Sequence, residues 1–476
     1  MNASLRNVGG TSGSTGLLRS IAALTWPQLC TLLCQFIISL TDIWAGGRLG
    51  SDVQASIGLI TQCQMMLMVF CTATVSGAVA VVSQSLGAGR RARARRYVGL
   101  ITAMTLLLGV GLALLGMLLR HPFLSLLGTP DSIRPTALLF FSATMWAMPG
   151  HYGMTIGAAL FRSAKSVLRP LYVTIMVCLL NIAGDLGFGL GWWNFPKYGA
   201  AAIAWSTTFA ATLGAATLFF FLLRDGLLSY QSRLSWRWIK KGAPYLLHVA
   251  VPALGTSAVW QTGYLIMFII TASLPEGSVA ALAGLTAGLR IEGILFMPAV
   301  ACNMTAGVLV GHALGQGGRA MAMRTALTIL ALGCGVMSLA GAAIWPVRGI
   351  LASMLTPDPD VSIATTTYLT YNILAVPCTV TSIILAGVFN GAGASIYPMR
   401  AFIISIWTVR LPLAWLFGHV LWKTADGVFM AMLVSQIVQS AFLFWALLRQ
   451  DWRSFAMRQT SPHTHPEKVS HAFRSY

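Results

Sequence analysis

Charged side chains are scarce in this sequence. Only 9% of its 476 residues are charged, Asp and Glu together number 12, and 56% of the residues are hydrophobic, with a mean hydropathy of +0.74. This composition excludes an ordinary soluble globular protein and indicates an integral membrane protein. The net charge of +19 would suggest nucleic-acid binding in a soluble chain. In a membrane protein a cytoplasmic bias of Lys and Arg explains it, so we expect no nucleic-acid partner.

Histidine and cysteine groupings that bind metals or catalyse reactions are also missing. All eight cysteines lie in apolar stretches, as is typical of small buried hydrophobic residues rather than of disulfides. Cys30 and Cys34 are one helical turn apart, but no His or second Cys pair accompanies them, which favours packing over metal binding. The eight histidines show no metal or acid–base spacing, so we expect neither an enzyme nor a bound cofactor. The first 16 residues show no signal-peptide cleavage pattern.

What the sequence does have is a series of long apolar runs. Each is long enough for the ~20 residues that a membrane span requires, so we expect an all-α integral membrane protein with twelve transmembrane helices. The expected spans are 19–45, 53–84, 97–120, 134–159, 170–190, 198–223, 244–273, 279–313, 325–346, 363–390, 399–421 and 427–448. Lys and Arg number 23 in the termini and the connections after even-numbered spans, against 6 in the other connections. Both termini should therefore be cytoplasmic.

An internal repeat relates the two halves of the chain. Gly87 and Gly315, Pro149 and Pro377, and Gly199 and Gly427 are all 228 residues apart. Six spans per half place both halves in the membrane in the same sense, the parallel-repeat plan of many secondary transporters, with a site between or within the halves. The expected domains are a cytoplasmic segment (1–18), an N-lobe (19–223), a cytoplasmic linker (224–243), a C-lobe (244–448) and a cytoplasmic tail (449–476).

Two acidic residues of the first half have no acidic counterpart in the second. Asn181 and Asp185 lie four residues apart in the fifth span, so a helix places both side chains on one face. Asp42 lies late in the first span, at a similar depth. Two carboxylates with an amide between them offer oxygen ligands for Na⁺ or a shared proton. The alternative is that these acids end helices in the headgroup region.

Glu292 is a third intramembrane acid, and its role has two interpretations. It could pair with Arg290 or with Arg410 as a structural group, or it could bind protons or substrate. Both interpretations remain open from the sequence alone.

Prolines and methionines within the spans suggest hinges and a cavity. Pro27 and Pro252 would bend the first and seventh spans, either as hinges or as fixed kinks. An adaptable apolar cavity could be lined by the following residues, for which contact with lipid or the protein core is the alternative: Met65, Met66, Tyr264, Met267, Phe296 and Met297.

In these features the sequence resembles the multidrug and toxic compound extrusion (MATE) transporters across roughly 19–448. The resemblance rests on the order, spacing and duplication of short motifs. They are Pro27 with Thr41-Asp42-Ile43, the run Val82-Ser83-Gln84-Ser85-Leu86-Gly87-Ala88-Gly89, Phe161-Arg162 with Pro170, Asn181-Ile182, Gly199-Ala200-Ala201 through Thr207, Arg290-Ile291-Glu292 and Arg410-Leu411-Pro412.

This resemblance implies a V-shaped pair of six-helix lobes that exports organic, often cationic or amphipathic compounds in exchange for H⁺ or Na⁺. In the branch that resembles archaeal and DNA-damage-inducible bacterial members, the coupling site lies in the N-lobe, at positions that match Asp42, Asn181, Asp185 and Thr207. We expect a monomer in the bilayer of the plasma membrane, the inner membrane of bacteria. A lipid-linked oligosaccharide flippase of the same superfamily is the alternative.

Overall fold

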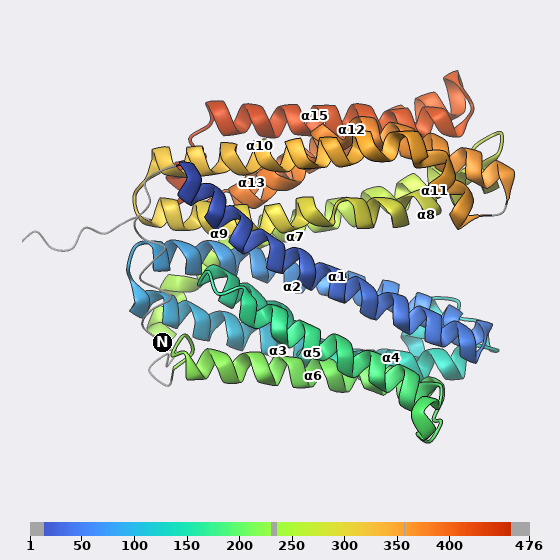
Figure 1. Ribbon diagram of the computed structural model, residues 1–476, viewed down its shortest axis with the longest axis horizontal. Helices are drawn as coiled ribbons and strands as arrows, with labels where there is room; N and C mark the ends of the chain where they lie inside the picture. The colour runs from blue at the N-terminus through green and yellow to red at the C-terminus, as the bar shows by residue number, and fades with distance from the viewer. Residues whose placement is uncertain (1–13, 230–235, 357, 458–476) are drawn as a thin grey trace, which may run out of the picture.

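The apolar runs form long helices because, in lipid, backbone N–H and C=O groups must bond within their own segment. The computed structural model describes residues 14–229, 236–356 and 358–457, and it confirms an all-α membrane fold. Figure 1 shows the helices as two bundles lying side by side, with α1 running diagonally across the front. Several helices have 36 or 37 residues, about 55 Å, and so extend beyond the ~30 Å hydrocarbon core.

The first half of the chain forms six long helices. The fifth continues directly into a π-helical turn, η1, and a short turn, η2, follows. These elements are α1 (Ser14–Leu49), α2 (Ser51–Gly87), α3 (Arg91–Leu126), α4 (Arg134–Ser163), α5 (Leu168–Gly184), η1 (Asp185–Gly189), η2 (Trp192–Asn194) and α6 (Ala200–Arg224).

The second half repeats this order with more interruptions. Its elements are α7 (Trp236–Ala272), α8 (Ser278–Leu295), α9 (Met297–Gly315), α10 (Arg319–Ile344), η4 (Trp345–Val347), α11 (Arg348–Leu355), α12 (Pro359–Ala392), α13 (Ile396–Phe402), η5 (Ile403–Arg410), α14 (Leu411–Trp415), η6 (Leu416–Leu421), α15 (Ala425–Arg449) and η7 (Trp452–Phe455).

One expected span is broken in two. The run 279–313 becomes α8 and α9, which join at Phe296, whereas its counterpart α2 is continuous. The break falls just before Pro298, because a proline lacks the N–H that would continue the helix and fits best in a first turn.

The hydropathy of the helices also gives twelve candidate spans within the described residues, but not the same twelve. These candidates count α8 and α9 separately and leave out α4. α4 has 30 residues, packs against α2, α3 and α6, and carries Gly150, Gly153 and Gly157 on its buried face. It is the central helix of the first bundle. Fewer of its residues face lipid than in the outer helices, so fewer of them need to be strongly apolar.

The first and seventh helices connect the bundles. α1 packs against α9 as well as α5, and α7 packs against α2 as well as α13. Pro27 and Pro252 lie inside these two helices, and neither proline interrupts its helix.

The bundles meet at the end where the basic connections lie, which we call the basic end. There the Gln84 Nε2 atom donates to the Gly391 carbonyl (2.9 Å), and His312 Nε2 lies 2.8 Å from the Ser163 carbonyl, to which it donates. These two hydrogen bonds are equivalent by the internal repeat, because the offset of 228 residues relates Gln84 to His312 and Ser163 to Gly391. We call this symmetric pair of hydrogen bonds the latch.

Glycines allow α2 and α9 to cross closely beside the latch. A Cβ atom at Gly87 would lie 2.3 Å from the His312 carbonyl oxygen, and one at Gly315 would lie 2.2 Å from that of Gln84. The C-terminal stretch adds to the junction, because the Met457 backbone N–H donates to Gln84 Oε1 (2.8 Å).

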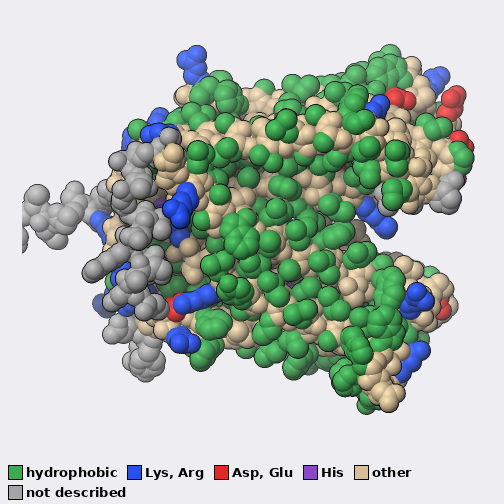
Figure 2. All heavy atoms as spheres, in the orientation of Figure 1, with side chains coloured by type: hydrophobic (Ala, Val, Ile, Leu, Met, Phe, Trp, Pro, Cys, Tyr) green, Lys and Arg blue, Asp and Glu red, His purple; other side chains and the backbone are tan. Residues whose placement is uncertain are grey.

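At the opposite end the bundles separate. Figure 2 shows the molecule hollowed between the two bundles at that end, while Lys and Arg side chains gather at the basic end. The described chain is therefore closed at the basic end and open at the other.

Some expected segments lie partly or wholly outside the described residues. They are 1–13 of the N-terminal segment, 230–235 of the linker and 458–476 of the tail. Trp236 and Trp238 of the expected linker form the first turn of α7 itself.

Candidate cation site

The acidic face of the fifth span lies at a change in helix type. Asn181 is in the last turn of α5, and Asp185 is the first residue of the π-helical turn η1. Both are buried, with 1% and 0% of their surface exposed. π-Turns are frequent at functional sites, although η5 and η6 of the second half are π-helical as well.

Two other helices complete the site. α1 brings the Asp42 carboxylate beside Asp185 and Asn181, and α6 brings Ser206 and Thr207. Gly184 allows α6 to come this close, because a Cβ atom there would lie 2.5 Å from the Ser206 Cβ atom.

Hydrogen bonds fix one side of Asn181 and one side of Asp185. Asn181 Nδ2 donates to Thr207 Oγ1 (2.9 Å), and Ser206 Oγ donates to Asp185 Oδ1 (2.5 Å). Their other oxygens, Asn181 Oδ1 and Asp185 Oδ2, are buried and have no hydrogen-bond partner in the described residues, and the same is true of Asp42 Oδ1.

Three neighbouring acceptor oxygens without a donor are suited to a bound cation. A buried carboxylate is costly unless a positive charge or a proton compensates it, and two adjacent carboxylates make the cost larger. Carboxylate, amide and hydroxyl oxygens are the ligands of hard cations. No set of three or more His, Cys, Asp or Glu side chains suited to a metal occurs in the part of the chain that the structure describes. The donor set therefore fits a proton or Na⁺ rather than a transition metal.

The structure brings together all four residues that the sequence nominates for this site, Asp42, Asn181, Asp185 and Thr207. Sequence reasoning missed Ser206, which makes the shortest contact to Asp185. Its only signal was its place next to Thr207 on α6, and serines are too common in membrane helices for that to stand out.

Neither ion pair considered for Glu292, with Arg290 or with Arg410, forms in the described residues. Glu292 instead accepts a hydrogen bond from the Tyr368 hydroxyl. Arg410, with 1% of its surface exposed, donates to Ser435 Oγ (2.8 Å) and lies 5.7 Å from the centre of the Tyr264 ring, while Arg290 is exposed. Because the Tyr368 hydroxyl donates a hydrogen bond to the Glu292 carboxylate, this carboxylate has a partner without either arginine side chain.

The residues expected to line a cavity do not share one surface. Met65 and Met66 are exposed on α2, whereas Met267 and Phe296 are buried in two different hydrophobic clusters. Tyr264 packs against the Trp260 ring, 4.6 Å between centres, and Met297 is half-buried at the start of α9.

Comparisons with known proteins agree with this architecture. The MatE family model matches two segments of the chain, residues 27–186 and 252–416, which begin at the two related prolines Pro27 and Pro252. The chain belongs to the MATE transporter family. This MATE chain is 24% identical over 458 residues to a probable multidrug resistance protein NorM of Thermotoga maritima, covering 92% of this chain and 94% of that protein. It is 20% identical over 442 residues to the uncharacterized transporter YisQ of Bacillus subtilis, covering 91% and 94%.

Solved structures share the fold of this MATE chain. The Vibrio cholerae MATE transporter VcmN in the bent form matches with a TM-score of 0.83 at 22% identity, covering 93% of this chain and 98% of that chain. An outward-facing conformation of a multidrug resistance MATE family transporter matches with a TM-score of 0.84 at 16% identity, covering 94% and 100%.

Proposed function

We propose that this protein is a secondary active multidrug efflux transporter that exports organic, often cationic or amphipathic compounds by antiport with H⁺ or Na⁺. The observation that carries the antiport proposal is a group of three buried oxygens to which no described residue donates a hydrogen bond. They belong to Asp42, Asn181 and Asp185. A scaffold alone has no need for two adjacent carboxylates in a membrane, since each costs several kcal/mol, on the order of 2.5–3.5 by insertion scales.

The relatives support efflux as the activity. Relatives of this chain carry the names of probable multidrug resistance proteins, NorM in several bacteria and YoeA in Bacillus subtilis. The flippase alternative finds no such support among them, so we retain only efflux.

The distribution of charge supports an outward-facing state. If the basic end faces the cytoplasm, as the positive-inside rule favours, both termini are cytoplasmic and the hollow between the bundles faces outward. We assign the N-lobe to 19–223, the linker to 224–243 and the C-lobe to 244–448, in the plasma membrane.

The geometry suggests how ion and substrate are coupled. Asp42 belongs to α1, which leaves the first bundle to pack against α9 of the second. A cation that binds at Asp42 and Asp185 ties the outer half of α1 to the first bundle, and Pro27 allows the inner half to move separately, as Pro252 allows in α7. Ion and substrate must favour different states of the lobes, since otherwise neither drives the other.

The test is efflux of a fluorescent cationic dye from reconstituted vesicles under a pH gradient or a Na⁺ gradient, imposed separately. We expect one of these gradients to drive efflux. Asp42→Asn and Asp185→Asn should each lower gradient-driven efflux by about tenfold or more. Asp52→Asn, which removes an exposed carboxylate from the first turn of α2, is the matched control and should leave efflux unchanged. Undiminished efflux in both site variants would refute the site.

A further inference from the structure

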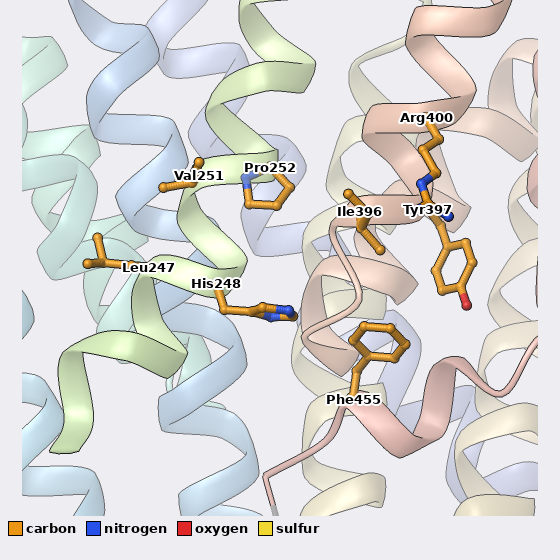
Figure 3. A pocket seen from close by; sticks show the side chains of 8 residues that line it. All are labelled: Leu247, His248, Val251, Pro252, Ile396, Tyr397, Arg400 and Phe455. Atoms are coloured by element: carbon orange, nitrogen blue, oxygen red, sulfur yellow. The ribbon is translucent and has the colours of Figure 1, made fainter.

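A cavity lies away from the cation site, between the second bundle's α7 and α13 near the basic end. Its volume is about 510 Å³. It is lined by Leu247, Val251 and Pro252 of α7 and by Ile396 of α13. Figure 3 shows Pro252 extending from α7 toward Ile396, with Leu247 and Val251 on the other side of α7 and the Phe455 ring below Ile396. These walls are apolar, and the cavity is open on one side.

A single permanent charge borders this apolar cavity. Arg400 of α13 is exposed, and its side chain runs toward Tyr397 along the cavity wall (Figure 3). In the described residues Arg400 has no hydrogen bond or ion pair. A guanidinium binds phosphate in a bidentate way, so Arg400 is an unused anion ligand at the edge of an apolar space.

By the repeat offset, the counterpart of Arg400 in the first bundle is Tyr172, and an arginine whose charge is neutralised lies one helical turn before it. There Arg169 of α5, the counterpart of Tyr397 by the repeat offset, forms an ion pair with Asp225. Its guanidinium also lies 5.8 and 5.9 Å from the centres of the Phe161 and Phe221 rings. The first bundle thus supplies its own counter-charge, whereas the second leaves Arg400 without one.

We propose that this cavity binds an anionic phospholipid of the leaflet at the basic end, with its phosphate on Arg400 and part of an acyl chain between α7 and α13. The cavity combines the two features that such a lipid needs, apolar walls and an exposed basic group near the basic end of the molecule. His248 completes the polar edge, with its ring 5.9 Å from that of Phe455 and 6.5 Å from that of Tyr245.

The charge and the apolar walls together exclude simpler occupants. A zwitterionic lipid gains little from an unpaired arginine, and a free phosphate ion leaves the apolar volume unfilled. The proposal concerns lipid binding and does not depend on the coupling ion or on the exported compound.

The experiment measures lipid binding to the full-length protein in detergent by native mass spectrometry, with short-chain phosphatidylglycerol, short-chain phosphatidylcholine and inorganic phosphate as separate probes. We expect phosphatidylglycerol to bind more tightly than the other two. Arg400→Gln should weaken its binding about fivefold, the effect of one basic residue at a membrane surface. Arg324→Gln is the matched control, because it removes an exposed arginine near the same end of the same half.

A second variant tests the apolar part of the site. Ile396→Phe narrows the cavity without changing charge, and we expect it to weaken binding of phosphatidylglycerol while leaving that of phosphate unchanged. Equal lipid binding by Arg400→Gln and Arg324→Gln would overturn the proposal, as would tighter binding of inorganic phosphate or phosphatidylcholine than of phosphatidylglycerol.

Discussion

At the scale of single residues, the candidate cation site shows why burial of a polar atom is informative. One carboxylate oxygen of Asp185 accepts a hydrogen bond from Ser206, and the other has no partner. Likewise, the amide nitrogen of Asn181 donates to Thr207, while its amide oxygen has no partner. Each side chain is therefore held in place by one atom and left free to bind with the other.

Ser206 should adjust the strength of ion binding without being essential for it. Its hydroxyl competes with a proton or Na⁺ for the Asp185 carboxylate, so Ser206→Ala removes a competitor. We expect the ion concentration for half-maximal efflux to fall about tenfold, the effect of one hydrogen bond to a charged group. The measurement is dye efflux from vesicles as a function of the driving ion.

Thr217→Ala provides the control for that measurement. Thr217 lies on the same helix, and its hydroxyl bonds to the Leu213 carbonyl of its own backbone. If both alanine variants shift the ion dependence equally, Ser206 has no specific part in the site.

Most of the candidate site could be predicted from the sequence, because charges within apolar runs are rare and therefore visible. Asp42 and Asp185 stand out for this reason. Ser206 does not, since only the close approach of α6 at Gly184 gives it a role. The contact of Glu292 with Tyr368 was also hidden, because tyrosines in apolar runs carry no charge to mark them.

At the scale of helices, the sequence predicted where apolar segments lie but not where they bend. By the repeat, α8 and α9 together correspond to the single continuous helix α2. Pro298 is the local feature that divides the second-half segment into two helices. The hydrogen bonds between halves were invisible as well, because Gln84 and His312 bond to backbone carbonyls, which every sequence has.

The latch should stabilise the state in which the two bundles are closed at the basic end. Gln84→Ala or His312→Ala removes one inter-bundle hydrogen bond, worth roughly 0.5–1.5 kcal/mol net. We therefore expect each to raise the fraction of molecules open at the basic end about two- to tenfold. Distances between spin labels placed on the basic ends of α3 and α10 measure that fraction.

Gln316→Ala is the control for the latch, because Gln316 is exposed at the end of α9, one turn from His312. The latch would have no role in closure if His312→Ala and Gln316→Ala gave the same distance distributions.

At the scale of the whole molecule, the two lobes touch through α1, α2, α7 and α9 near the basic end and separate at the other. The alternating access that we propose requires these contacts to part while the packing inside each lobe persists. A covalent bond between lobes should stop transport, and an equivalent bond within one lobe should not.

Two pairs of introduced cysteines, one between the lobes and one within a lobe, allow this comparison. They are placed in a variant from which the eight native cysteines have been removed. A Cβ atom at Gly77 of α2 would lie 3.5 Å from that of Ala250 of α7, and one at Gly341 of α10 would lie 3.9 Å from that of Val376 of α12. Both separations suit a disulfide, for which the Cβ atoms lie ≈ 3.5–4.5 Å apart.

Oxidised Gly77→Cys/Ala250→Cys should lose gradient-driven dye efflux and regain it on reduction, because the bond joins elements that must separate. Oxidised Gly341→Cys/Val376→Cys should transport at the rate of its reduced form, since α10 and α12 move together within one lobe. Gel mobility of the cleaved protein verifies that each bond has formed. Full efflux with the first bond intact would mean that the lobes do not part at α2 and α7, and closure would then have to be sought within a single lobe.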